Sequence, residues 1–118
     1  MVLQIVVVHI GHRLRVPLKP EILMGRQDSN SNVFPEVNLT PYGAVEKGVS
    51  RQHARIVFHD GELTIEDIGS VNGTFLNGRR IVPYQAMPLN DGDVVQLGKL
   101  VLQVYFDLLD SAQESLPE

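Results

Sequence analysis

The sequence predicts an all-β fold, a sandwich of antiparallel strands. Short runs rich in valine, isoleucine and other β-favouring residues recur along the chain, and turn residues separate them. No stretch of useful length shows the 3.6-residue apolar period of an amphipathic helix. With 118 residues, of which 43% are hydrophobic, the chain can bury one core and is too short for two.

Four strand pairs are predicted, each joined by a tight turn. They cover residues 4–18 with the turn at Gly11-His12, residues 54–67 with Asp60-Gly61, residues 73–82 with Asn77-Gly78, and residues 93–106 with Gly98-Lys99. In the second pair, Ala54, Ile56 and Phe58 alternate along the chain with His53, Arg55 and Val57. Such alternation is typical of a strand with one face in the core.

One long irregular stretch, residues 27–49, interrupts this pattern and is rich in Ser, Asn, Pro and Gly. Only residues 36–39 within it resemble a strand, and the "LTPYG" segment, Leu39 to Gly43, is predicted to form a turn. Compact domains rarely carry loops this long unless the loop is disordered or serves a function. The stretch leads directly into "GVSRQHARI", residues 48–56, where we look for a site.

The charge and composition exclude several classes of protein. The net charge of −4 comes from the last twelve residues, which hold four acidic side chains and no Lys or Arg, so residues 1–106 are neutral. We therefore expect one domain over residues 1–106, a flexible acidic tail over 107–118, and no nucleic-acid partner. The absence of cysteine excludes disulfides and thiol catalysis.

No apolar run approaches the roughly 20 residues of a membrane span. The opening "MVLQIVVVHIG" lacks the positive region and cleavage site of a signal peptide, so it is interpreted as a first strand. The expected location is the cytoplasm, without a membrane partner.

Three kinds of chemistry are compatible with the residue types around "GVSRQHARI". A hydrolytic triad of Ser50, His53 and Asp67 is disfavoured because no Gly-x-Ser-x-Gly elbow is present, and we expect no enzyme. A metal site is disfavoured because the four histidines, at positions 9, 12, 53 and 59, show no metal-ligand spacing, so no metal or cofactor is expected.

An anion site fits these residues better. Ser50 supplies a hydroxyl, Arg26 and Arg51 supply guanidinium groups, and the backbone amides of residues 48–51 are further candidate donors. Such donors suit a phosphate dianion. The alternative interpretation of Arg26 is a surface arginine paired with Asp28.

Four motifs recur in one order: "MGR" at residues 24–26, "VSRQHARI" at 49–56, "DIGSVNGTFLNG" at 67–78 and "LNDGDVVQLG" at 89–98. Together, over Ile22 to Gly98, they resemble the forkhead-associated (FHA) domain. The resemblance implies a sandwich of two twisted antiparallel sheets whose loops at one end bind phosphothreonine peptides. The implied partner is a phosphothreonine protein in signalling, a Ser/Thr kinase or its substrate.

The resemblance also implies roles for individual residues. Arg26 resembles the arginine that contacts the phosphate. Ser50 resembles the serine that contacts the phosphate through its hydroxyl and backbone, and Arg51 beside it is a further donor. Asn72 resembles the asparagine that holds the peptide backbone. His53 resembles a histidine that braces the loops without touching ligand. The positions that resemble loop-shaping ones are Gly25, Gly73, Thr74, Asn77 and Gly78.

One departure from the family pattern concerns Val71, where some members carry a Thr or Ser that adds a hydroxyl to the phosphate. The alternative function is therefore an interaction or assembly module that keeps the fold and has lost phosphate recognition. Lys47, Arg51 and Arg79 are candidate readers of an acidic residue in the bound peptide.

Overall fold

The computed structural model describes residues 1–107, so the predicted acidic tail lies outside the described residues except for Asp107. The strands are β1 Val2–Val7, β2 His12–Pro17, β3 Glu21–Gly25, β4 Val37–Asn38, β5 Ala54–His59, β6 Glu62–Asp67, β7 Thr74–Leu76, β8 Arg79–Arg80, β9 Met87–Pro88, β10 Val94–Leu97 and β11 Leu100–Tyr105. None of the helical segments within residues 1–107 has the length and apolarity needed to cross a membrane.

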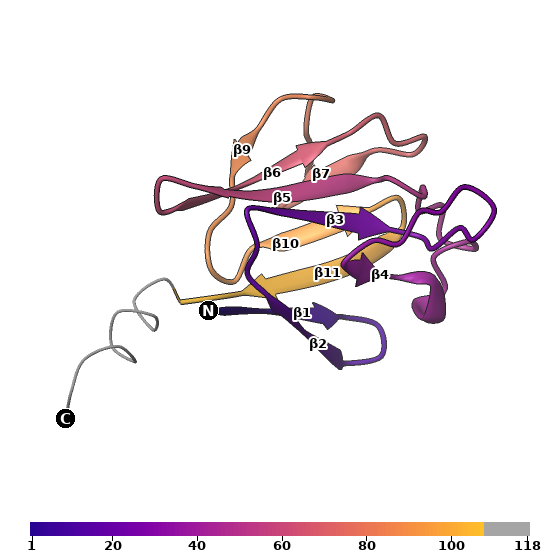
Figure 1. The fold of residues 1–118 in the computed structure, drawn as a ribbon, viewed down its shortest axis with the longest axis horizontal. Helices are drawn as coiled ribbons and strands as arrows, with labels where there is room; N and C mark the ends of the chain where they lie inside the picture. Colours follow the sequence, from indigo (N-terminus) through magenta and orange to yellow (C-terminus); the bar gives the residue numbers. More distant parts are fainter. Residues whose placement is uncertain (108–118) are drawn as a thin grey trace.

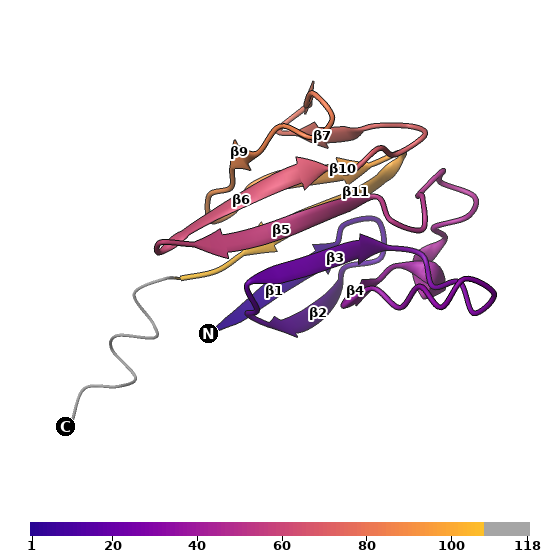
Figure 2. The ribbon, with the colours of Figure 1, turned by 45° about the horizontal axis from the view of Figure 1, so that its top comes forward.

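The strands form two sheets, which Figure 1 and Figure 2 show as stacked layers. One sheet has the order β2-β1-β11-β10-β7-β8 and the other has the order β4-β3-β5-β6-β9. The predicted all-β sandwich is confirmed. Its pairs are antiparallel except that β4 runs parallel to β3, with Met24 opposite Val37 and Gly25 opposite Asn38.

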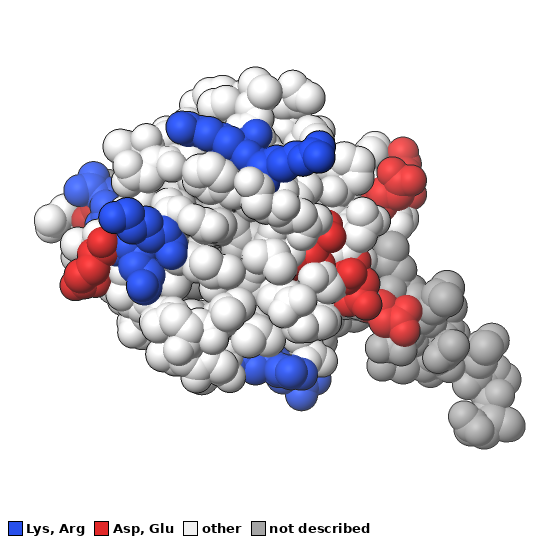
Figure 3. Space-filling view, turned by 180° about the vertical axis from the view of Figure 1, so that it is seen from behind, with Lys and Arg blue, Asp and Glu red and all other residues white. Residues whose placement is uncertain are grey.

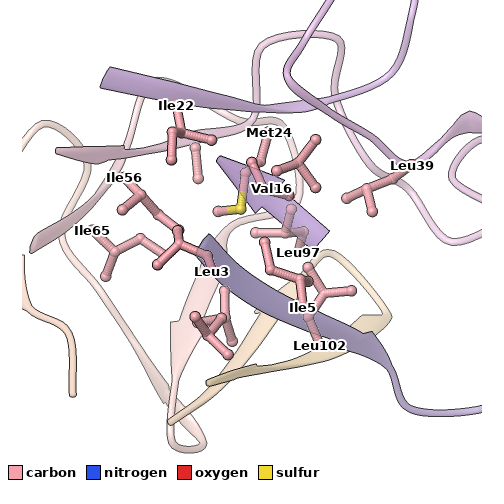
Figure 4. Close-up of a cluster of buried hydrophobic side chains, with 14 of the residues drawn as sticks. Leu3, Ile5, Val16, Ile22, Met24, Leu39, Ile56, Ile65, Leu97 and Leu102 are labelled. Carbon is pink, nitrogen blue, oxygen red and sulfur yellow. The ribbon is translucent and has the colours of Figure 1, made fainter. Parts of the chain in front are cut away.

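The core lies between the two sheets, because alternate residues of each strand point inward. In β1 the buried positions are Leu3, Ile5 and Val7, and in β3 they are Ile22 and Met24. Figure 4 shows the labelled side chains of β1 and β3 near those of the other strands: Leu3, Ile5, Ile22 and Met24 with Ile56, Ile65, Leu97 and Leu102. The alternation seen in the sequence therefore describes the packing correctly.

Turns join all four predicted strand pairs, but the first turn covers residues 8–11 and not Gly11-His12, because His12 already belongs to β2. Asp60 and Gly61 both have positive φ, at 51° and 77°, as do Asn77 and Gly78, at 50° and 85°. Two successive residues in this region match the twist of flanking strands and favour Asp-Gly and Asn-Gly pairs. The "LTPYG" segment also turns, as a short 3-10 helix, η1 Thr40–Tyr42, that ends at the left-handed Gly43.

Candidate functional site

The loop after β3 and the loop before β5 are in direct contact at one end of the sandwich, the right-hand end in Figure 1. The Arg26 amide donates to the Ser50 carbonyl at 3.2 Å. A Cβ atom on Gly25 would lie 2.0 Å from the Arg51 carbonyl oxygen, so no side chain fits there. Gly25 is thus required for close approach of two backbones, not for a positive φ.

This contact positions the Arg26 side chain. Its Nε donates to the Val49 carbonyl at 2.5 Å, in a part-buried position. Within residues 1–107 the guanidinium makes no ion pair, and the carboxylate considered as its partner, Asp28, instead binds Arg51 Nε at 2.9 Å. The surface-pair interpretation of Arg26 is therefore wrong. The two terminal NH₂ groups of Arg26 are available to an anion.

Asp28 is itself held in a small turn. Its carboxylate accepts hydrogen bonds from the Ser31 hydroxyl at 2.6 Å and the Asn30 amide at 3.1 Å. The Ser31 bond is the main cause that lowers the pKa of Asp28, with the Arg51 charge contributing, so the carboxylate is ionised at neutral pH. Arg51 is therefore partly neutralised in the free protein.

Ser50 lies beside Arg26, and the hydroxyl and the backbone amide of Ser50 bind different partners. Its hydroxyl oxygen accepts a hydrogen bond from the Val71 amide at 3.1 Å, which leaves the hydroxyl proton free to be donated. Its backbone amide donates to His53 Nδ1 at 2.9 Å. The Ser50 backbone was expected to contact phosphate, but in this structure its amide is already bound by the histidine.

The amides of Gly48 and Val49 are also occupied within the chain, by the Val45 and Ala44 carbonyls. Of the four amides considered as phosphate donors, those of residues 48–50 are thus bound to acceptors elsewhere in the chain. Only the Arg51 amide has no acceptor within the described part of the chain. The donor set is consequently smaller than the sequence suggested: side chains contribute most of it.

His53 is fully buried and connects two loops. Its Nδ1 accepts from the Ser50 amide, so its Nε2 carries the proton and donates to the Gly73 carbonyl at 2.9 Å. Burial lowers the pKa of His53, although the Gly73 bond and the Asp67 charge oppose this effect. The neutral form is therefore the one that fits both partners.

These contacts do not assemble a catalytic triad. Both ring nitrogens of His53 bind backbone groups, and neither contacts the Ser50 hydroxyl. The Asp67 carboxylate is bound by the hydroxyls of Ser70 and Thr74. Residues 1–107 contain no cluster of three side chains suited to hold a metal ion.

Asp67 instead organises the loop between β6 and β7. It is buried and accepts hydrogen bonds from the amides of Gly69 and Ser70, at 3.1 and 3.2 Å, besides the two hydroxyls. Burial alone would raise the pKa of Asp67, but the bonds from Ser70 and Thr74 outweigh it and lower the pKa. This role of Asp67 was not anticipated from the sequence. An Asp followed by a Ser three residues later is the signal of such a turn.

Asn72 lies in the same loop and reaches across to the loop before β5. Its Nδ2 donates to the Gly48 carbonyl at 3.0 Å, and a Cβ atom on Gly48 would lie 2.4 Å from that nitrogen. The neighbouring Gly73 carbonyl accepts from Gly98 at the β10–β11 turn as well as from His53. Four separate segments are thereby joined around the candidate site.

Two residues assigned to loop shaping lie elsewhere. Asn77 and Gly78 form the β7–β8 turn, where Asn77 Nδ2 donates to Asp93 and Asn77 Oδ1 accepts from the Val94 amide at 2.9 Å. Val94 begins β10, whereas the site contacts the residue after the end of β10, Gly98. Asn77 and Gly78 therefore stabilise the β7–β8 turn and its contact with the start of β10. This contact lies at the other end of β10 from Gly98 and the candidate site.

The three candidate readers of an acidic peptide residue are also separated. Lys47 lines a groove of about 480 Å³ beside Asn72, together with Lys99. Arg51 is paired with Asp28, and Arg79 lines another groove. Lys99 was not anticipated from the sequence.

The fold and this site define a β-sandwich that carries the Arg26 guanidinium and the Ser50 hydroxyl on the loops at one end. The model of the FHA domain family matches residues 22–98, about two thirds of the chain. The chain belongs to the FHA domain family.

Known relatives are much longer proteins. The chain is 37% identical over 107 residues to the ABC transporter ATP-binding/permease protein Rv1747 of Mycobacterium tuberculosis, which covers 90% of this chain and 11% of that protein. It is 38% identical over 69 residues to the FHA domain-containing protein At4g14490 of Arabidopsis thaliana, which covers 58% of this chain and 18% of that protein.

Solved structures show the same fold. The solution structure of an FHA domain of an Arabidopsis thaliana protein matches with a TM-score of 0.70 and 30% identity, covering 99% of this chain and 89% of that one. The N-terminal FHA domain of S. cerevisiae Rad53p, in complex with a phosphothreonine peptide, matches with a TM-score of 0.76 and 20% identity, covering 98% and 100%.

Proposed function

We propose that residues 1–106 form a phosphothreonine-dependent peptide-binding module that reads marks written by a kinase. The observation that carries this proposal is the pair of donors at the loop end. Arg26 is held by Val49 and Ser50 by Val71, and each keeps a donor without a partner in the described part of the chain. Donors fixed in place before binding lose little freedom when a ligand arrives.

The energetics suit a phosphorylated ligand and not a neutral one. A phosphothreonine carries about −1.5 to −2 charge at neutral pH and three acceptor oxygens. Each hydrogen bond to a charged group contributes about 1.5–3 kcal/mol, so two or three bonds from Arg26 and Ser50 give about 4–8 kcal/mol. The ordering of the peptide opposes this, and micromolar affinity, about −8 kcal/mol, needs help from backbone contacts.

Asn72 is suited to supply those backbone contacts. Its Nδ2 binds Gly48, while its Oδ1 has no recorded partner among residues 1–107 and can accept from a peptide amide. Arg51 adds a further donor, but only in competition with Asp28. The Val71 amide donates to Ser50, and the Val71 side chain is 82% exposed. Because valine is apolar, this position offers no hydroxyl to the ligand.

The partner we propose is a phosphothreonine-containing Ser/Thr kinase or one of its substrates, met in the cytoplasm. Support comes from the solved FHA domains that match this chain. One is in complex with a phosphothreonine peptide, and another, the FhaA FHA domain at 26% identity, is complexed with the intracellular domain of Rv3910.

The decisive experiment titrates the protein with a library of phosphothreonine peptides and, in parallel, with the same peptides unphosphorylated. We expect micromolar binding to a subset of the phosphorylated peptides and none to the others. Equal binding of both libraries, or none to either in a protein that still self-associates or captures a folded partner, would favour the alternative assembly module.

A further inference from the structure

A second groove lies along β7 and β8, at the edge of the larger sheet. We call it the β7–β8 groove, and its volume is about 570 Å³. The residues that line it include four apolar ones and two arginines: Leu76, Ile81, Val82, Met87, Arg79 and Arg80. Val82 is 60% exposed, so its apolar side chain is accessible to a ligand in the groove.

The two arginines are positive charges that the described part of the chain leaves without an ion pair, since the ion pairs found there involve Arg51, Arg55 and His59. Figure 3 shows Lys and Arg side chains gathered near its upper edge, with no Asp or Glu directly beside them on this face. The groove therefore suits a ligand that combines an apolar side chain with carboxylates.

Arg80, which lines the groove, also reaches the loop that carries Asn72. A Cβ atom on Gly73 would lie 2.7 Å from Arg80 Nε and 2.9 Å from Arg80 Cζ, so the guanidinium lies directly against Gly73. Gly73 follows Asn72, the residue assigned to the peptide backbone. Leu76 is four residues from Asn72, so their Cα atoms are at most about 14 Å apart. A peptide of four or five extended residues covers this distance.

We propose that the β7–β8 groove is a second docking site for the phosphothreonine ligand itself, and that it takes an apolar side chain flanked by acidic residues. The inference rests on the proposed function. Because both sites engage one chain, the second contact is intramolecular once the phosphothreonine is bound, and a weak groove interaction then raises the affinity. Arg80 would contact a carboxylate as the peptide leaves Asn72, and Val82 would meet the apolar side chain.

The test uses three phosphothreonine peptides of equal length and measures the dissociation constant by fluorescence anisotropy. One has neutral, small flanks. The others carry an Asp-Leu-Asp segment four to six residues from the phosphothreonine, on its N-terminal side in one and its C-terminal side in the other. The variants are Arg80→Ala and Val82→Asp, and Arg15→Ala on β2 is the matched control.

We expect one of the two extended peptides to bind the wild type and Arg15→Ala at least five-fold more tightly than the neutral one. Arg80→Ala and Val82→Asp should each remove this advantage, while Val82→Asp leaves the neutral phosphopeptide unaffected. Equal affinity for all three phosphopeptides, or an advantage that survives both variants, would overturn the inference. Failure of the proposed function would look different, because then no peptide would depend on its phosphate.

Discussion

Replacing Arg26 with alanine should abolish phosphopeptide binding and leave the protein folded. The side chain makes one internal bond, from Nε to the Val49 carbonyl, and its terminal NH₂ groups face no acceptor among residues 1–107. Loss of two charge-assisted bonds at about 1.5–3 kcal/mol each removes about 3–6 kcal/mol. At about 1.4 kcal/mol per tenfold, affinity falls at least about 100-fold, from micromolar to beyond detection.

The cost in stability should be much smaller. Only the part-buried bond to Val49 is lost, which corresponds to about 0.5–1.5 kcal/mol. For a domain of this size that lowers the melting temperature by about 2–8 °C. Binding and stability are therefore affected to very different extents, and calorimetric titration with scanning fluorimetry on the same sample measures both.

Two matched variants sharpen the result. Arg26→Lys keeps the charge but loses the planar guanidinium fork. The lysine cannot bind the Val49 carbonyl and two phosphate oxygens together, so we expect a loss of peptide affinity intermediate between wild type and Arg26→Ala. Arg15→Ala removes an exposed arginine from β2 and should change neither quantity. If folded Arg26→Ala bound within threefold of the wild type, Arg26 would not be the phosphate ligand.

Further outcomes test how the loops are held. Gly25→Ala places a Cβ 2.0 Å from the Arg51 carbonyl oxygen, so the loop must shift and peptide affinity measured by calorimetry should fall at least tenfold; unchanged affinity would contradict this. The pKa of His53 is lowered by burial, so the unfolded state takes up the proton more readily. The contribution of the neutral His53 to the free energy of unfolding is fully present above pH 6.5 and declines as the pH falls below that value. His53→Gln should therefore make the melting temperature of the peptide-free protein fall less steeply with decreasing pH. Thr74→Val removes a donor from the buried Asp67 carboxylate and should lower the free energy of unfolding by about 1–3 kcal/mol in urea denaturation; a loss below 0.5 kcal/mol, on the order of an ordinary surface change, would argue that water replaces the hydroxyl.

The strands and turns were predictable because their signals are local. Alternation along residues 54–58 places Ala54 and Ile56 in the core, and Asn77-Gly78 forms the expected tight turn. The strand expected within residues 36–39 is present as β4, whereas the two-residue β9 escaped detection, because its strand geometry comes from pairing with β6. Two residues are too few to show a period.

The sandwich, the family and the residues that carry charge or hydroxyl groups near the loops can all be predicted from the sequence. Which of these groups remain available is set by the tertiary structure. It assigns the Ser50 amide to His53, Asp28 to Arg51, and the Arg80 guanidinium to a place against Gly73. Strand alternation and turn φ depend on neighbours a few residues away. The site instead depends on contacts between residues 20 to 24 positions apart, such as His53 with Gly73 and Asn72 with Gly48. Those partners become neighbours only when the two sheets pack and bring their loops to one end.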